Sequence, residues 1–274
     1  MKTPKLLGIH AKPGRKLNAM LVALPFILLI ASYLIGSNLR LQRNEHDKVM
    51  PSLSRIWAGI ERVALSEHPR TGKIMIVQDT LVSLQRMGLG LSVAALCALI
   101  VGLNAGMFPG LRPATIPLVT FMSTISPIAL LPILLVAFKG GEMAKPTFIF
   151  LGTVLVMMRD IYNTVERIPK EQITQVLTLG AGQLNIVYEV VLPQIMPRLL
   201  TNVRLALGPA WIYLIASEAM GANAGLGHQI FLQSRLFNMD VVIPYVLWIT
   251  FIGFVMDTAF RKFIEWKYLW YRVR

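Results

Sequence analysis

Residues 81–106 of this chain read LVSLQRMGLGLSVAALCALIVGLNAG, an apolar run whose one charged side chain is Arg86. A helix needs about 20 apolar residues to cross the hydrocarbon core of a bilayer, and this run is longer than that. It also lacks the polar face that a surface helix of a soluble protein turns toward water. The run therefore predicts a transmembrane helix.

Other apolar windows follow the same pattern along the chain. They are Leu17–Gly36, Ile116–Phe138, Pro146–Met158, Leu205–Met220 and Val241–Phe260. The windows that start at Pro146 and Leu205 are shorter than a straight span requires, so we expect them to extend through neighbouring arginines or to be surrounded by protein. The fold class predicted is all-α, a polytopic membrane protein with about six transmembrane helices.

Composition excludes a soluble globular protein. Of the 274 residues, 55% are apolar and 15% are charged, whereas a typical soluble domain has about 25% charged residues. The net charge of +13 suits a nucleic-acid partner only where it is clustered on an exposed face, and here much of it lies in the two terminal tails. Such tails are typical of cytoplasmic flanks beside anionic lipid, so we expect a bilayer and no nucleic acid as partner.

The windows divide the chain into tails, spans and connections. Residues 1–16 and 261–274 are predicted to be basic cytoplasmic tails, and residues 17–260 form one transmembrane domain. With both termini in the cytoplasm, residues 38–80 lie outside and residues 160–204 lie inside.

The external segment carries two signals. Its basic residues, such as Arg40 and Arg55, argue mildly against this orientation. The basic tails and the even number of spans outweigh them. Its apolar residues between Leu53 and Ala64 recur at helical spacing, which predicts a short amphipathic helix at the outer interface.

The third window is interrupted by proline. Residues 121–132 read FMSTISPIALLP; each proline removes a backbone donor, and the neighbouring hydroxyls can bind the carbonyl groups that are freed. A broken helix with hydroxyls at membrane depth is typical of a translocation pathway, but a kink needed only for packing fits equally well. The pathway candidates are Ser123, Thr124, Ser126, Pro127 and Pro132.

The cytoplasmic connection has the most specific pattern in the chain. Apolar residues recur at helical spacing before and after Gly180–Ala181–Gly182, which predicts two short amphipathic helices joined at a glycine turn. Pro193 and Pro197 are expected to end the second helix before the fifth span begins. The connection is much longer than the usual 2–8 residues of a helix–helix link. Such a length suits an element that docks into a groove on a soluble partner.

This connection resembles the cytoplasmic signature of the membrane subunits of bacterial importers driven by ATP-binding cassettes. The signature is Glu-Ala-Ala, three residues, Gly, nine residues and then Ile-x-Leu-Pro. Gly180 matches the glycine and Val190–Val191–Leu192–Pro193 matches the end, but Thr174–Gln175–Val176 replaces Glu-Ala-Ala. That departure removes the glutamate that is expected to pair with the ATPase. Glu171, one turn earlier, can compensate for its loss.

Further motifs resemble the branch of this family that includes taurine, alkanesulfonate, nitrate and bicarbonate permeases. They lie in register over residues 50 to 262 and are Met50–Pro51–Ser52, Gly141–Glu142–Met143–Ala144–Lys145, Leu207–Gly208–Pro209–Ala210–Trp211, Ser217–Glu218–Ala219–Met220–Gly221 and Gly225–Leu226–Gly227. Each motif is weak alone, whereas the ordered set is specific.

The resemblance implies the type I ABC importer permease fold in the bacterial inner (cytoplasmic) membrane. It implies a homodimer with a second permease copy, two ATP-binding cassette subunits and a periplasmic solute-binding protein. ATP and Mg are expected in the partner subunit, with no cofactor in this chain. The residues expected to couple to the ATPase are Glu171, Thr174, Leu177, Gly180, Ala181, Gly182, Leu184 and Pro193.

Ionisable side chains near the membrane are costly and tend to be functional. Arg86 lies near the outer end of the second span and Glu218 at the outer end of the fifth. Together with Glu142, from the Gly-Glu-x-x-Lys motif, they are the candidates for a gate or a contact with the binding protein. Plain interfacial exposure is the open alternative.

Catalytic and metal-binding motifs are missing from the sequence. It has no Walker loop, no His-Glu-x-x-His and no Gly-x-Ser-x-Gly. His10, His46, His68 and His228 fall outside the spans and Cys97 lies within one, so we expect no metal site, no catalytic residue and no enzyme activity in this chain.

The function predicted is the membrane-spanning permease subunit of an ATP-driven importer. Its solute is expected to be small and polar: a sulfonate such as taurine, nitrate, bicarbonate, or a urea-like or guanidine-like nitrogen compound. The alternative is a stand-alone secondary transporter or channel.

Overall fold

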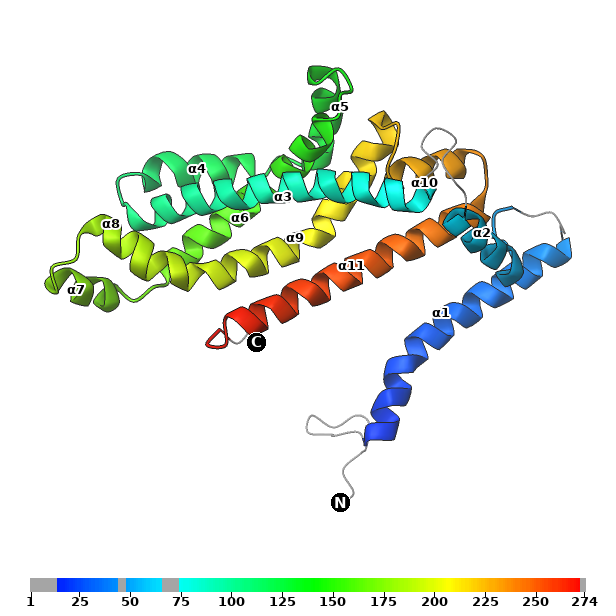
Figure 1. Ribbon diagram of the computed structural model, residues 1–274, viewed down its shortest axis with the longest axis horizontal. Coiled ribbons are helices and arrows are strands. Elements are labelled where there is room, and N and C mark those ends of the chain that lie inside the picture. Colours follow the sequence, from blue (N-terminus) through cyan, green and yellow to red (C-terminus); the bar gives the residue numbers. More distant parts are fainter. Residues whose placement is uncertain (1–13, 44–47, 66–73, 272–274) are drawn as a thin grey trace.

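The computed structural model describes residues 14–43, 48–65 and 74–271, which are almost entirely helical. The predicted tails beyond this range, together with His10, His46 and His68, lie outside the described residues. The elements, drawn in Figure 1, are α1 (Arg15–Arg43), α2 (Leu53–Leu65), α3 (Met75–Met107), α4 (Arg112–Met122), α5 (Pro127–Ala137), α6 (Ala144–Glu166), α7 (Lys170–Thr178), α8 (Gln183–Asn185), the π-helical turn η1 (Ile186–Val191), α9 (Leu192–Gly221), α10 (Leu226–Arg235) and α11 (Met239–Lys267).

Five helical stretches are long and apolar enough to cross a membrane: α1, α3, α6, α9 with its lead-in from Gln183, and α11. The pair α4 and α5 passes the same test as one span that is bent by 93°. The described residues thus contain up to six spans, which confirms the predicted fold class. The two windows that looked short become full-length helices, because α6 and α9 extend past the charged residues that bounded those windows.

The centre of the bundle is the close packing of α3 against α6. Gly90, Ala94, Ala98 and Gly102 repeat every four residues on α3, and both alanines are fully buried. A Cβ atom added at Gly102 would lie 2.8 Å from the carbonyl oxygen of Met158. Small residues at this spacing let two membrane helices approach closely, where packing replaces the hydrophobic effect as the driving force.

The prediction that Pro193 and Pro197 end a helix is wrong. The helical path runs unbroken from Gln183 to Gly221. Pro193 directly follows the π-helical turn, in which the Leu192 N–H donates to the Val187 carbonyl, so the regular α-helical hydrogen bonds are already interrupted where its N–H is missing. Pro197 removes only a bond near the helix start, next to the π-helical turn, where the regular pattern of hydrogen bonds has already changed.

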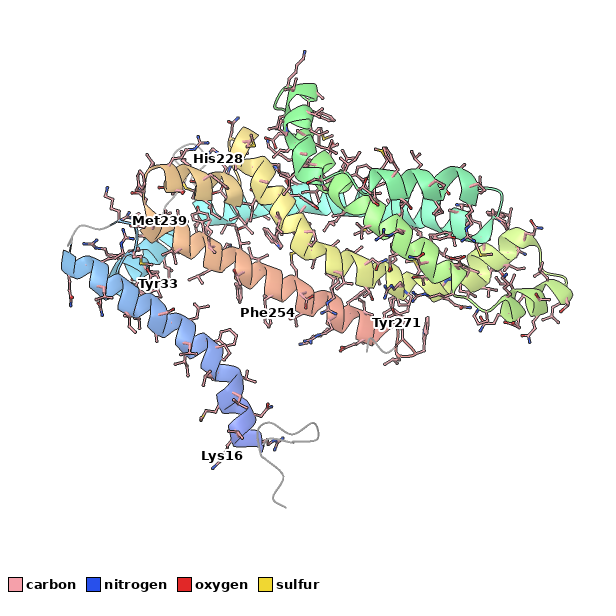
Figure 2. All side chains as sticks on the ribbon, turned by 180° about the vertical axis from the view of Figure 1, so that it is seen from behind. Lys16, Tyr33, His228, Met239, Phe254 and Tyr271 are labelled. Atoms are coloured by element: carbon pink, nitrogen blue, oxygen red, sulfur yellow. The ribbon has the colours of Figure 1, made fainter. Side chains whose placement is uncertain are left out.

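Helix α1 stands apart from the bundle, whereas α2 packs against α11 and α3. None of the apolar window of α1 is buried, and Figure 2 shows its side chains standing clear of the other helices. Its contacts are with the segment before α2, where the Tyr33 hydroxyl donates to the Pro51 carbonyl at 2.8 Å. Helix α2 buries Ile56 and Val63, which confirms the predicted amphipathic helix.

The bundle has two different ends. Helices α7 and α8 lie at one end, near the end of α11, whereas α2 and α10 lie at the other (Figure 1). We call these the α7 end and the α10 end.

Candidate functional site

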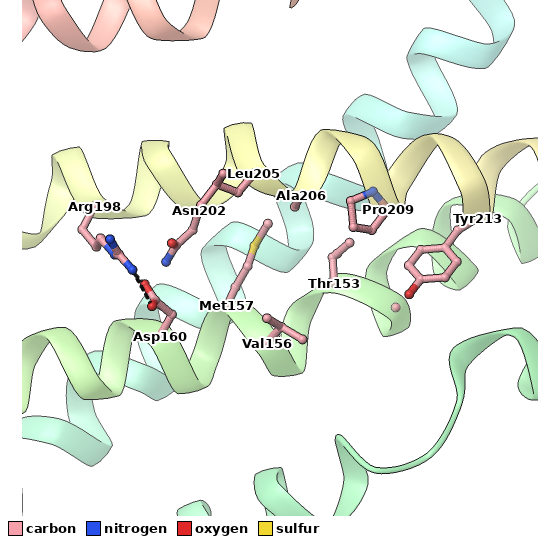
Figure 3. A pocket seen from close by; sticks show the side chains of 11 residues that line it. Thr153, Val156, Met157, Asp160, Arg198, Asn202, Leu205, Ala206, Pro209 and Tyr213 are labelled. Atoms are coloured by element: carbon pink, nitrogen blue, oxygen red, sulfur yellow. Dashed lines mark hydrogen bonds and ion pairs between the residues drawn. The ribbon is translucent and has the colours of Figure 1, made fainter. Parts of the chain in front are cut away.

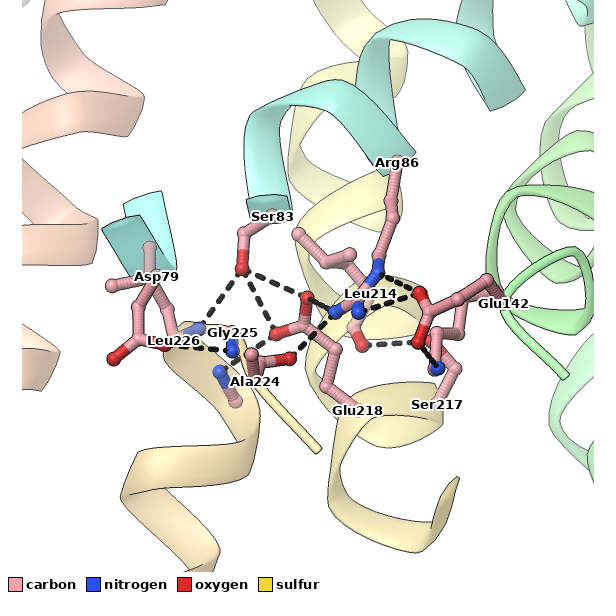
Figure 4. A network of polar contacts seen from close by, with 12 residues as sticks. Asp79, Ser83, Arg86, Glu142, Leu214, Ser217, Glu218, Ala224, Gly225 and Leu226 are labelled. Carbon is pink, nitrogen blue, oxygen red and sulfur yellow. Dashed lines mark hydrogen bonds and ion pairs between the residues drawn. The ribbon is translucent and has the colours of Figure 1, made fainter. Parts of the chain in front are cut away.

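A cluster of charged and polar side chains joins four helical elements at the α10 end (Figure 4). At its centre, Arg86 of α3 lies between two carboxylates. Its Nη1 is 2.7 Å from Oε1 of Glu218, and its Nη2 is 2.6 Å from Oε2 of Glu142. The structure therefore brings together the three residues that the sequence offered separately as gate candidates. We call Asp79, Ser83, Arg86, Glu142, Lys145 and Glu218 the polar cluster.

Glu142 is the exposed member of the polar cluster. Its Oε1 accepts from Nζ of Lys145 at 2.7 Å, and Lys145 itself is buried. Partial burial acts to raise the pKa of the Glu142 carboxyl, but hydrogen bonds from Lys145 and Arg86, together with their charges, outweigh burial and hold that pKa below its ordinary value. Glu142 therefore carries a negative charge at neutral pH.

Glu218 is fully buried and yet well partnered. Besides Arg86, its two oxygens accept from the Ser83 hydroxyl at 2.8 and 3.0 Å, and Oε2 accepts from the backbone N–H of Gly227 at 2.8 Å. A buried carboxylate is tolerated only when an opposite charge and additional hydrogen bonds replace its water. The polar cluster supplies both.

The start of α10 supplies the remaining donors. The N–H of Gly225 donates to Oδ1 of Asp79 at 2.9 Å, and the N–H of Leu226 donates to the Ser83 hydroxyl at 2.9 Å. These are the free amides at the beginning of a helix, which favour anionic partners. Gly225 has a φ of 125°, and a Cβ there would lie 2.5 Å from Glu218 Oε1. The Gly-Leu-Gly motif therefore supplies the backbone hydrogen-bond donors of the polar cluster.

Sequence reasoning missed Asp79 and Ser83. A signal for them was present, because Asp79, Ser83 and Arg86 stand at positions i, i+4 and i+7 and so share one face of α3. Three polar residues on one face of an otherwise apolar helix indicate a buried polar contact.

The predicted glycine turn is present at the α7 end. Gly180 has a φ of 87°, and the N–H of Ala181 donates to the Val176 carbonyl at 3.3 Å, a pattern that commonly ends helices. A Cβ atom at Gly180 would meet nothing within 4 Å. Glycine is therefore required here by backbone conformation and not by a close neighbour.

Most of the residues predicted to couple to an ATPase are exposed around this turn. Exposed are Glu171, Thr174, Leu177, Gly180, Gly182, Leu184 and Pro193, whereas Ala181 is half-buried. Leu179 was missed, because it lies outside the periodic apolar set, although its side chain is 85% exposed. Directly after the turn, Ile186 and Val187 are buried against α3 and α6 residues, which attaches the turn firmly to the bundle.

The predicted pathway residues lie at the break between α4 and α5. The Ser123 hydroxyl donates to the Thr120 carbonyl at 2.8 Å and that of Thr124 to the Phe121 carbonyl at 2.7 Å. These hydroxyls therefore bind carbonyls of α4, and not those of residues 123 and 128 that Pro127 and Pro132 free. Ser126 precedes α5, Pro127 begins it and Pro132 lies within it. All five side chains are exposed or half-buried, and their role in a pathway stays a prediction.

A cavity of about 250 Å³ lies between α6 and α9 (Figure 3). At its edge nearest the α7 end, Arg198 of α9 and Asp160 of α6 form a two-pronged ion pair, with Nε and Nη2 each 2.7 Å from a carboxylate oxygen. A second pair, Arg204 with Asp257 at 2.6 Å, joins α9 to α11. Within the residues that the structure describes, no group of three or more His, Cys, Asp or Glu side chains is placed to hold a metal ion.

Comparison with known sequences gives consistent matches. The model of the family described as binding-protein-dependent transport system inner membrane component matches residues 91–265. A putative ABC transporter permease protein of Methanocaldococcus jannaschii is 28% identical over 97% of this chain and 96% of that protein. A taurine transport system permease protein of Escherichia coli is 29% identical over 67% of each chain, and a bicarbonate transport system permease protein of Synechococcus elongatus is 30% identical over 70% of this chain and 68% of that one.

Among solved structures, the MetNI methionine ABC transporter in an inward-facing conformation superposes with a TM-score of 0.58 at 20% identity. The match covers 70% of this chain and 95% of that chain. It shows that the bundle has the type I importer permease fold.

Proposed function

Since the chain belongs to the family of binding-protein-dependent transport system inner membrane components, we propose that it forms half of a homodimeric permease for a small polar solute. It is a multi-pass inner-membrane protein and the permease subunit of an ABC importer. In our proposal, two ATP-binding cassette subunits bind at the α7 end, and they hold the ATP and Mg while this chain performs no bond chemistry.

The observation that carries the proposal is the apolar surface of the glycine turn. Leu177, Leu179 and Leu184 are 45%, 85% and 63% exposed around it. Several large apolar side chains exposed around one turn are typical of a protein–protein contact. Because Gly180 fixes the shape of the turn, the patch is preorganised for a groove on the ATPase.

The unbroken helix from Gln183 to Gly221 gives this contact a mechanical consequence. The stretch has 39 residues and is about 58 Å long at 1.5 Å per residue. It connects the glycine turn directly to Glu218 in the polar cluster. When nucleotide closes the ATPase pair, a movement of the turn is carried along this continuous helix to the opposite end, as in other two-state transitions driven by a ligand.

The same arrangement assigns the sides of the membrane. With the bent pair α4–α5 counted as one span, the described helices make six crossings, which fits both termini on one side, and in our proposal an ATPase at the α7 end makes that side the cytoplasm. The α10 end then faces outward, where the polar cluster and α10 are available to a periplasmic solute-binding protein. In importers of this kind the binding protein selects the solute. Calorimetry on the binding protein of the same transport system, with taurine, nitrate, bicarbonate and urea as probes, identifies it.

The test replaces the apolar patch with charge. The double variant Leu179→Asp/Leu184→Asp is expected to fold normally but to lose co-purification with the ATPase by at least about tenfold, because two carboxylates would be buried in the contact. The matched control is Leu269→Asp, whose side chain is 83% exposed near the same end. Retained co-purification with stimulated ATP hydrolysis would contradict the proposal. Uptake that needs no ATPase would favour a stand-alone secondary transporter or channel.

A further inference from the structure

An open pocket beside the polar cluster contains hydrogen-bond donors that the fold leaves unused. The pocket has a volume of about 380 Å³ and lies between the α5–α6 turn, the end of α9 and α10. We call it the outer pocket. Three side chains in its lining can donate hydrogen bonds: Asn223, His228 and Arg235; His228 is labelled in Figure 2. None of these side chains has a hydrogen bond or an ion pair within the residues that the structure describes.

The lining of the outer pocket carries charge of one sign. Among the described residues that form it, Arg235 is the one arginine and none is acidic. Lys139 directly precedes Gly140 of the lining; it is exposed and has no ion pair within the described part of the chain. Its φ of 51° is strained for a residue other than glycine, and such strain is concentrated at functional sites.

The acidic side chains around the outer pocket do not cancel this charge. Each acidic side chain that the structure describes at the α10 end already has a partner; they are Glu61, Asp79, Glu142, Glu218 and Asp240. Glu142 stands on the same α5–α6 turn as the pocket lining, but Arg86 and Lys145 bind its two oxygens. The surface is therefore left with free positive charge, which attracts an acidic partner.

The apolar part of the lining indicates that this partner is a protein and not a free ion. Met220, Phe231 and Leu232 line the pocket and are 63%, 41% and 42% exposed. A small hydrated ion gains nothing from these side chains, whereas a protein surface buries them. Protein–protein contacts commonly combine exposed aromatic and methionine side chains with an arginine as the polar anchor.

We propose that the outer pocket receives an acidic side chain of the periplasmic solute-binding protein, an aspartate or glutamate whose carboxylate is held by Arg235. This inference rests on the proposed function and names the chemistry of that partner. A guanidinium binds a carboxylate through two parallel hydrogen bonds. Asn223 and His228 supply the further donors that a carboxylate needs when a contact removes its water.

The position of the outer pocket links docking to the polar cluster. In the chain, Ala219 of the lining directly follows Glu218, and Asn223 directly precedes Ala224, whose carbonyl accepts from Nη1 of Arg86 at 2.8 Å. A protein bound in the pocket therefore contacts the same two connections, α5–α6 and α9–α10, that the polar cluster joins. Docking can in this way act on the outer ends of the spans.

The first experiment measures the affinity of the solute-loaded binding protein for the permease–ATPase complex in lipid nanodiscs. Arg235→Glu is expected to raise the Kd at least about tenfold, because two like charges would meet in the contact. Arg235→Lys keeps the charge but not the two-pronged geometry, so its Kd should rise by only about threefold. Lys48→Glu is the matched control: Lys48 is exposed in the α1–α2 connection, and the same charge reversal there should change the Kd less than about twofold. All three variants should co-purify normally with the ATPase.

The second experiment identifies the group that enters the outer pocket. A water-soluble carbodiimide joins an amine to a carboxylate with loss of water and adds no spacer, so it links only groups in direct contact. Applied to the assembled complex of the Arg235→Lys variant, it is expected to link position 235 to an aspartate or glutamate of the binding protein, as read by mass spectrometry of the linked peptides. A link from position 235 to a second permease copy, and none to the binding protein, would overturn the proposal.

The outer pocket and the importer function fail in distinguishable ways. If the wild type binds the binding protein and Arg235→Glu leaves the Kd unchanged, the docking pocket is wrong and the importer function stands. If Arg235→Glu lowers uptake at saturating binding protein without changing the Kd, the pocket contacts free solute and the docking proposal is again overturned. A wild-type chain that neither binds the ATPase nor transports with ATP would overturn the importer function itself.

Discussion

Both ends of the bundle depend on a glycine at positive φ, but the two glycines serve different purposes. At the α10 end, Gly225 lets backbone amides approach Glu218, and the charges there are buried and partnered. At the α7 end, Gly180 shapes a turn whose neighbours Leu179 and Leu184 are exposed. One region is completed within the chain and the other needs a partner.

This difference has a consequence for how variants should behave. Changes in the polar cluster should lower the stability of the isolated chain, because its groups satisfy one another. Changes at the glycine turn should leave stability nearly unaltered and act on assembly.

The largest effect is expected for Arg86→Gln. The variant leaves Glu218 buried without its opposite charge, and breaking a buried pair in this way costs about 3–5 kcal/mol. Thermal unfolding of the purified chain in detergent measures the loss. The control is Arg112→Gln, because the Arg112–Glu166 pair is about half exposed and such pairs contribute less than about 1 kcal/mol. Equal destabilisation by the two variants would contradict the predicted difference in stability between the buried polar cluster and an exposed ion pair.

Gly225→Ala should rank second. Its Cβ would meet the Glu218 carboxylate at 2.5 Å and the Arg86 guanidinium at 2.8 Å, at a φ of 125°. Strained backbone and overpacking together are expected to cost at least about 2 kcal/mol in the free energy of unfolding. Gly110→Ala provides the comparison, since a Cβ there meets nothing within 4 Å and should change stability by less than about 0.5 kcal/mol.

A smaller effect is expected for Gly180→Ala. The added Cβ has open space, so the cost is the left-handed conformation alone, about 1–2 kcal/mol. Because the turn can relax locally, we expect weaker binding of the ATPase and little change in the melting temperature. Gly182→Ala, at a position without a positive φ, should bind the ATPase normally. Loss of binding in both variants would indicate crowding against the partner instead of backbone shape.

The smallest effect concerns pH and Glu142. Its carboxyl has a pKa below the ordinary 4.5, so its ion pairs stabilise the fold fully above that value and are lost as the pH falls through the lower, folded-state pKa. The melting temperature of wild type relative to Glu142→Gln should therefore be constant between about pH 6 and 8 and converge below about pH 4. A difference that changes near neutral pH would assign the titration to another group.

Sequence patterns predicted the elements better than their contacts. Hydropathy found the spans, and periodicity found α2 and the glycine turn, because both are properties of local sequence. The windows of α6 and α9 appeared too short because Arg159 and Arg204 bounded them. Arg204 is matched across helices by Asp257, and Asp160, next to Arg159, is matched by Arg198. Pairing between distant residues is not visible in one sequence.

The polar cluster shows the same limit at the site. Arg86, Glu142 and Glu218 were recognised one by one, as ionisable residues or motif members, while their meeting around the start of α10 depends on how four elements pack. Pro193 and Pro197 were misread for a related reason. The rule that proline ends a helix assumes a regular helix before it, and here a π-helical turn precedes both residues.

The most direct test of this contrast is hydrogen–deuterium exchange of the permease in lipid nanodiscs, with and without its ATPase. We expect the amides of residues 225–227 to exchange slowly in both samples, because they donate to Asp79, Ser83 and Glu218. Amides of residues 177–185 should exchange rapidly in the isolated permease and become protected at least about tenfold in the complex. Unchanged exchange at residues 177–185 on ATPase binding, or rapid exchange at residues 225–227 in the isolated chain, would contradict it.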